Sequence, residues 1–118
     1  MSFALRFSIE AEKSIDHQLH GYKAQLDEGH ELAKRWFHKL GEALEALRDR
    51  PKRFGFAPEN GRWSPELELY QLKFRPWKTG STWRVLFVIE AKKKTVTVIQ
   101  IRHASRRRLV EPKEFVRA

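Results

Sequence analysis

The sequence predicts an α+β protein in which an N-terminal strand and a long α-helical hairpin pack on an antiparallel-dominated β-sheet. Apolar residues recur at helical spacing between residues 10 and 49. Residues 83–90 and the run that starts at Thr95 are almost continuously apolar, which is typical of strands covered on at least one face. The 118 residues contain no internal repeat and are 41% hydrophobic, so we expect a single domain over 1–118.

Residues 1–9 are predicted to hold the first strand, because apolar and other residues alternate from Phe3 to Phe7. Ser8 is suited to cap the helix that follows, whose first turn carries Glu10 and Glu12. The apolar stripe of this helix consists of Ile15, Leu19, Tyr22 and Leu26. A reversal at Asp27-Glu28-Gly29 then leads into the second helix, so that residues 10–49 form the hairpin.

The second helix has the clearest pattern in the chain, and Pro51 ends it. Its predicted stripe contains Leu32, Ala33, Trp36, Phe37, Leu40, Ala43, Leu44 and Leu47. We expect Leu32, Trp36, Leu40, Leu44 and Leu47 to be buried against Val85, Phe87, Val98 and Ile101.

Residues 51–65 are rich in Pro and Gly and are predicted to form a loop that Phe54, Phe56 and Trp63 attach to the core. A three-stranded meander follows over 66–104, with its first strand at 67–75. Strand alternation places Lys73 and Arg75 on one face of that strand, opposite to Leu72 and Phe74. Residues 105–118 form a basic tail.

The formal charge of +9 is confined to one half of the chain. Residues 1–61 contain ten Lys/Arg and ten Asp/Glu, whereas residues 62–118 contain fourteen and five. Such a field attracts polyanions or an acidic protein segment, although a basic surface also serves solubility. The absence of cysteine excludes disulfides and thiolate zinc sites, and no run is long enough to span a membrane. We expect a cytoplasmic protein that uses no metal and no cofactor.

Several motifs occur in a characteristic order. They are Ala33 and Trp36 with Leu40, Ala43, Leu44 and Leu47; Pro51-x-Arg53-Phe54; Ala57-Pro58-Glu59; Tyr70 to Arg75; Trp83 to Phe87; and Ile101 to Arg107. This ordered set, over residues 3–108, resembles the RelE/ParE superfamily of bacterial toxins. The resemblance implies a growth-inhibiting toxin of a type II toxin–antitoxin pair, silenced by a cognate antitoxin protein in a hetero-oligomer.

The resemblance implies one of two targets. ParE-like toxins poison DNA gyrase by binding, without catalytic residues of their own. RelE-like toxins cleave mRNA in the ribosomal A site without a metal, so they need proton-transfer groups and cations around the reacting phosphate. A third alternative is a non-toxic nucleic-acid or protein-binding module of the same fold.

The resemblance also assigns residues. If the protein is a ribonuclease, the catalytic candidates are Lys73, Arg84, His103 and Arg106. The candidates for binding nucleic acid or antitoxin are Lys73, Arg75, Arg84, Arg102, Arg106 and Arg107. Three observations favour the ParE-like branch: the helical hairpin is long, Gln71 stands where RelE-like enzymes have a lysine, and the tail lacks tyrosine.

Overall fold

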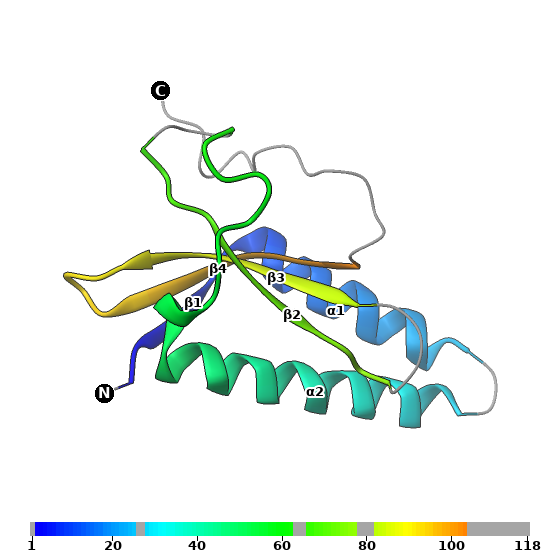
Figure 1. Ribbon diagram of the computed structural model, residues 1–118. Helices are drawn as coiled ribbons and strands as arrows, with labels where there is room; N and C mark the ends of the chain where they lie inside the picture. The colour runs from blue at the N-terminus through cyan, green and yellow to red at the C-terminus, as the bar shows by residue number, and fades with distance from the viewer. Residues whose placement is uncertain (1, 26–27, 63–65, 78–81, 104–118) are drawn as a thin grey trace.

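The computed structural model describes residues 2–25, 28–62, 66–77 and 82–103 (Figure 1). It has the predicted α+β architecture, with two helices on one side of a four-stranded sheet. Neither α-helix in these ranges has an apolar stretch able to cross a lipid bilayer. The elements in chain order are β1 (Ala4–Phe7), α1 (Ile9–Lys23), α2 (Gly29–Asp49), a short 3-10 helix (Pro51–Arg53), β2 (Tyr70–Phe74), β3 (Trp83–Glu90) and β4 (Thr95–His103).

The sheet has the strand order β1-β4-β3-β2. The β2–β3 and β3–β4 pairs are antiparallel, whereas β1 lies parallel to β4. The expected antiparallel-dominated sheet and the meander of β2, β3 and β4 are therefore confirmed. The strand predicted at 67–75 is shorter in the structure, because it begins only at Tyr70.

Ser8 joins β1, α1 and β4 at one point. Its hydroxyl accepts a hydrogen bond of 3.1 Å from the N–H of Ala11, which is the expected helix cap. The same hydroxyl donates a 2.5 Å hydrogen bond to the carbonyl oxygen of Ile99. The backbone N–H of Ser8 donates to the carbonyl of Val98. Since Ser8 is only 6% exposed, these bonds fix where α1 leaves the sheet.

We expect Ser8→Ala to lower the free energy of unfolding by about 1–3 kcal/mol, because the variant loses the cap and leaves a buried carbonyl without its donor. Chemical unfolding of the purified variant measures this loss. Ser14→Ala is the matched control: the Ser14 hydroxyl donates only to the Glu10 carbonyl one turn earlier, at the surface. Equal stability of the two variants would contradict the assigned role of Ser8.

The buried stripe of α2 is narrower than the sequence predicted. Its buried members are spaced alternately by four and three residues: Gly29, Ala33, Trp36, Leu40, Ala43 and Leu47. Leu32 and Leu44 lie at its margins and are half-buried. Phe37 was expected in the core, and that expectation is wrong, because its side chain is 54% exposed. It follows Trp36 by one residue, and a helix turns by about 100° per residue, so Phe37 faces solvent.

Gly29 allows the two helices to approach each other at the start of α2. A side chain at this buried position would collide with the backbone carbonyl oxygen of Tyr22, near the end of α1. The residues of the reversal at 26–27 lie outside the described ranges.

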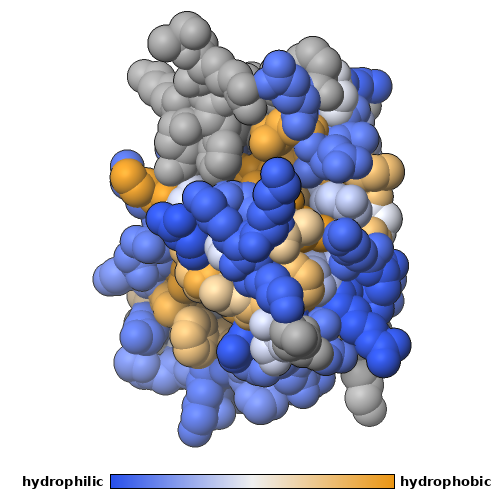
Figure 2. Space-filling view, turned by 90° about the vertical axis from the view of Figure 1, so that its left-hand side faces the viewer, coloured by the Kyte–Doolittle hydropathy of each residue, from blue (hydrophilic) through white to orange (hydrophobic). Residues whose placement is uncertain are grey.

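The sheet is covered differently on its two faces. The helices cover one face, where Trp36, Leu40 and Leu47 share a core with Val85, Phe87, Val98 and Ile101 as expected. On the other face, Ala57 and Leu69 pack with Leu86, Val88 and Ile99. The end of the molecule where the β3–β4 hairpin projects is mostly hydrophilic (Figure 2).

Of the three aromatic residues expected to attach the loop to the core, Phe54 does so, with its ring 6.4 Å from that of Phe87. Phe56 is 51% exposed and reaches the core only indirectly, through Tyr70. Its ring lies 4.8 Å from that of Tyr70, at the edge of the sheet. Burial, and secondarily the nearby Glu68 carboxylate, raises the pKa of Tyr70. Trp63 lies outside the described residues.

A β-bulge interrupts the pairing of β3 with β4. Leu86 pairs with Gln100 whereas Phe87 pairs with Val98, so that Ile99 is an extra residue on β4. The extra residue reverses the alternation of side chains, since Val98 and Ile101 both lie in the helix-side core although they are three positions apart.

Candidate anion-binding face

Three cations form one row across the sheet, on the face away from the helices. Lys73 of β2 pairs with Arg84 of β3, and Arg84 pairs with Arg102 of β4. Directly paired residues share a face, so these three candidate residues lie side by side on the sheet. We call Lys73, Arg84 and Arg102 the cation row. Like charges in such positions repel one another, which requires a compensating anion.

Glu59 supplies that anion. Its carboxylate accepts two hydrogen bonds from the guanidinium of Arg84, with donor–acceptor distances of 3.0 and 2.5 Å. The side chains of Arg84 and Glu59 are 11% and 1% exposed. A two-point ion pair this deeply buried fixes both planar groups. The central member of the row is therefore neutralised by the chain itself, and it holds residues 57–62 against the sheet.

Gln71 completes this network. Its side-chain oxygen accepts a 2.9 Å hydrogen bond from Nε of Arg84. An ammonium group at this position would offer no acceptor and would repel the guanidinium. The network thus gives a physical reason for glutamine where the resemblance leads one to expect lysine.

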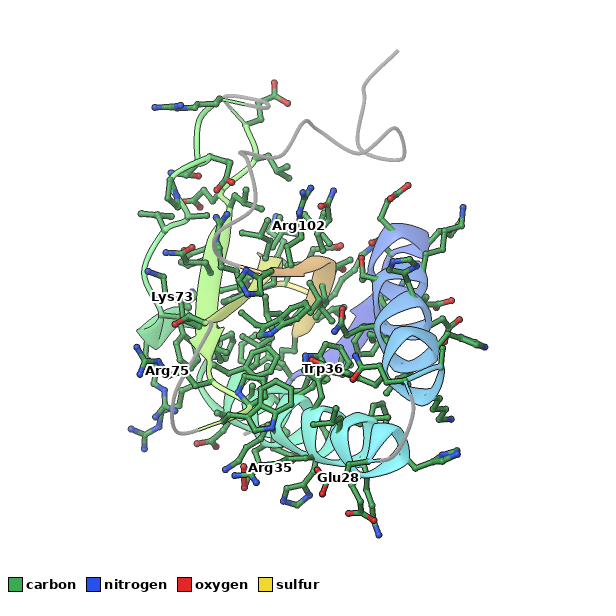
Figure 3. The ribbon with its side chains drawn as sticks, turned by 90° about the vertical axis from the view of Figure 1, so that its right-hand side faces the viewer. Glu28, Arg35, Trp36, Lys73, Arg75 and Arg102 are labelled. Carbon is green, nitrogen blue, oxygen red and sulfur yellow. The ribbon has the colours of Figure 1, made fainter. Side chains whose placement is uncertain are left out.

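The cations that meet solvent lie at the two ends of the row. Lys73 and Arg75 are exposed on the outer side of β2, and Nε of Arg75 donates a 3.4 Å hydrogen bond to Oγ1 of Thr82 (Figure 3). Arg102 is half-buried and lies over β4, on the side of the sheet away from α2 (Figure 3). It lines a groove of about 340 Å³ between α1 and β4, together with Lys13 and His17.

His103 does not join this set. Because of the bulge it lies on the helix side of β4, where its ring packs against that of Trp83 at a centroid distance of 5.4 Å. The sequence analysis grouped His103 with Arg102 as site candidates, but the two side chains lie on opposite faces of the sheet. Arg106 and Arg107 lie outside the described residues. Within the described ranges, no three His, Asp or Glu side chains converge as ligands for a metal ion.

The residue that sequence reasoning missed is Glu59. It belongs to a matching motif, Ala57-Pro58-Glu59, but nothing in the sequence points to its partner 25 residues away. The sequence showed only an acidic residue in a loop next to the basic half of the chain. Chemically, the face offers an exposed lysine at one end, a half-buried arginine at the other and a neutral, rigid centre, an arrangement suited to binding an extended anion.

No protein-family model and no curated protein sequence matches the chain. Solved structures do match. A chain of the chromosomal ParDE toxin–antitoxin system from P. aeruginosa is 15% identical, with a TM-score of 0.62 over 86% of this chain and 96% of that chain. A chain of the RelBE2 toxin–antitoxin complex from Mycobacterium tuberculosis is 20% identical, with a TM-score of 0.51 over 87% and 99%. The chain therefore has the fold of the RelE/ParE toxins, as its motifs predicted.

Proposed function

We propose that this protein is the growth-inhibiting toxin of a type II toxin–antitoxin pair. The observation that carries the proposal is the similarity of the fold to the ParDE chain, which extends over nearly the whole of both chains. The concentration of net positive charge in residues 62–118 supports it, because such a surface suits an acidic antitoxin or a nucleic-acid-containing target. A non-toxic binding module of the same fold is the competing class.

For the mechanism we favour ParE-like binding to DNA gyrase over catalysis. A ribonuclease of this fold needs a cation free to stabilise the charge that develops on the phosphate. Arg84, the central candidate, is instead committed to Glu59 and Gln71. His103, a candidate for proton transfer, lies on the opposite face of the sheet. These contacts support a surface that binds rather than one that reacts.

A metal-independent mRNA endonuclease is the second candidate, and one observation favours it. Lys73 and Arg102 lie on the same open face, two strands apart, where an RNA backbone could contact both. Lys73 would then be the proton acceptor and Arg102 a phosphate-binding cation.

We expect induced expression of the protein to arrest bacterial growth and to produce gyrase-linked DNA breaks. His103→Ala is expected to stay toxic, since its ring packs on the helix side. Lys73→Ala combined with Arg102→Ala is expected to weaken toxicity, whereas Lys93→Ala, which removes a cation from the exposed β3–β4 turn, is not. Growth curves, mapping of DNA breaks and mapping of mRNA ends on translating ribosomes measure these effects.

The outcomes separate the alternatives. Unimpaired growth with verified soluble protein would contradict a toxin of either kind. Site-specific mRNA cuts without DNA breaks would replace the gyrase mechanism by the ribonuclease. Arg84→Ala is a poor probe of catalysis here, because it also leaves Glu59 buried without its partner.

A further inference from the structure

The edge of β4 is bordered by α1 where β1 no longer covers it. β1 pairs only with the start of β4, from Thr95 to Val98. Beyond this stretch, the Ser8 hydroxyl donates to the carbonyl oxygen of Ile99, at the point where the chain turns into α1. A groove of about 340 Å³ lies between α1 and the last residues of β4. A helix and a strand, rather than loops, therefore form its walls.

The face of α1 that lines this groove is polar along its whole length. Its residues recur at the spacings of three and four that place side chains on one face of a helix: Glu10, Lys13, Ser14, His17 and Gln18. The neighbouring stripe of the same helix is apolar and packs on the helix-side core through Ile15, Leu19 and Tyr22. The core thus takes up the apolar face of α1, and the groove is left with a lining suited to a polar occupant.

β4 contributes a buried amide to the groove. Gln100 is only 9% exposed, and it lines the groove. Its side-chain amide makes no hydrogen bond with another described residue, yet among those residues only Nε1 of Trp36 is both completely enclosed and without a partner. The amide of Gln100 therefore reaches the groove. A nearly buried amide of this kind gains free energy when a ligand in the groove accepts its hydrogen bonds.

Positive charge collects around this amide. Lys13 and His17 follow each other by one turn of α1, and Arg102 adds a guanidinium from β4. The part of the chain that the structure describes supplies no ion-pair partner for Lys13. Glu10 is the one carboxylate among the described lining residues. The hydroxyl of Ser14 already donates to the Glu10 carbonyl. The groove thus combines two cations, an imidazole and an amide donor, which are groups that bind a phosphate.

We propose that the groove between α1 and β4 binds the phosphate group of a small phosphate monoester, such as a sugar phosphate or a mononucleotide. Lys13 and Arg102 would neutralise the dianion, and the amide of Gln100 would donate to one of its oxygens. The carboxylate of Glu10 would accept hydrogen bonds from hydroxyl groups of the ligand. A groove of about 340 Å³ lies at the lower end of the size range of small-molecule sites. The site does not depend on the proposed toxin activity.

Other occupants fit this lining less well. A divalent metal ion needs several oxygen ligands, whereas the lining offers one carboxylate beside two cations. An apolar peptide needs accessible apolar surface, but the apolar lining residues Trp83 and Ile101 are only 6% and 2% exposed. A nucleic-acid backbone presents a single negative charge at each phosphodiester, so it would use the cations less fully than a dianion does.

The test compares Lys13→Gln with Lys23→Gln. Both residues are exposed on α1, and each replacement lowers the net charge by one, but only Lys13 lines the groove. The probes are inorganic phosphate, ribose 5-phosphate and the dinucleoside phosphate UpU, which has a diester but no monoester. The full-length protein is titrated at constant ionic strength in a chloride buffer. The NMR signals of the Gln100 side-chain amide report binding and give the dissociation constant.

We expect inorganic phosphate and ribose 5-phosphate to shift the Gln100 amide signals, and Lys13→Gln to weaken the binding of both about tenfold. Lys23→Gln is expected to weaken it by less than about twofold, because salt screens a charge outside the groove. Equal effects of the two replacements would overturn the proposal, since the general positive field would then explain the binding. UpU bound as tightly as ribose 5-phosphate, with the same dependence on Lys13, would overturn the assignment to a monoester.

A third variant tests the contribution of β4. Gln100→Leu keeps nearly the same size but removes the amide, and we expect it to weaken phosphate binding about fivefold. Chemical unfolding shows whether this variant is folded. If it is not, the exposed pair Lys13→Gln and Lys23→Gln decides the matter alone. Phosphate binding with unimpaired growth on induced expression would reject the toxin and retain the site.

Discussion

Replacing Trp36 by alanine is expected to lower the free energy of unfolding by about 3–5 kcal/mol. The side chain is completely buried, and its ring contacts those of Trp83 at 5.3 Å and of Phe74 and Tyr22 at 6.4 Å. Alanine would remove this contact surface and leave a cavity between α2 and the sheet. The indole N–H has no hydrogen-bond partner among the described residues, so the expected loss is one of packing.

The matched control is Phe37→Ala, one residue further along α2. Phe37 is also aromatic and lies in the same helix, but it is 54% exposed. We therefore expect its replacement to change stability much less than that of Trp36. Denaturant unfolding measures the stability of both variants, provided that the dependence of the unfolding free energy on denaturant concentration is unchanged. Similar losses for the two variants would show that the narrow stripe of α2 is wrongly assigned.

The second large effect concerns the buried ion pair. Glu59→Ala is expected to cost about 3–5 kcal/mol, because it leaves the guanidinium of Arg84 buried without its carboxylate. Residues 57–62 would also lose their ionic attachment to the sheet, while the packing of Ala57 remains. Chemical unfolding measures the loss, and proteolysis of the loop under native conditions reports on its release.

A double replacement tests the reason for this loss. Glu59→Met combined with Arg84→Met removes both charges and is expected to recover most of the stability that Glu59→Ala loses. Lys93→Ala serves as the surface comparison, since Lys93 and Glu90 form an exposed pair at 3.7 Å whose loss is expected to cost at most about 1 kcal/mol. A double variant as unstable as Glu59→Ala would mean that the pair does more than neutralise charge.

The elements with strong periodicity could be predicted from the sequence. The stripe of α2, the cap at Ser8 and the stop before Pro51 are local signals, because the interactions that produce them span only a few residues. The alternation around Lys73 and Arg75 was equally local, and it placed both cations on the correct face. The error at Phe37 arose because a stripe read from apolar residues alone includes those at its margins.

The candidate site could be predicted only in part. The membership of Lys73, Arg84 and Arg102 in one row followed from strand order. The neutralisation of Arg84 did not, because Glu59 and Arg84 lie far apart in sequence and no local pattern connects them. The face of the sheet on which His103 lies could not be predicted either, because it depends on the β-bulge at Ile99. Both failures concern non-local pairing, which a single sequence does not encode in any periodic form.

That extra residue makes the chemistry of the sheet depend on the length of β4 as well as on its composition. With Ile99 present, Arg102 faces the open side and His103 faces the helices. Loss of one residue at this point, without any other change, would exchange the two, bringing an imidazole to the open face and burying a guanidinium beside Trp83. Proteins of this fold could thus acquire or lose a proton-transfer group through a single-codon deletion. In comparing them, the number of residues between the part of the last strand that pairs with β1 and the end of that strand is as informative as the identity of its final residues.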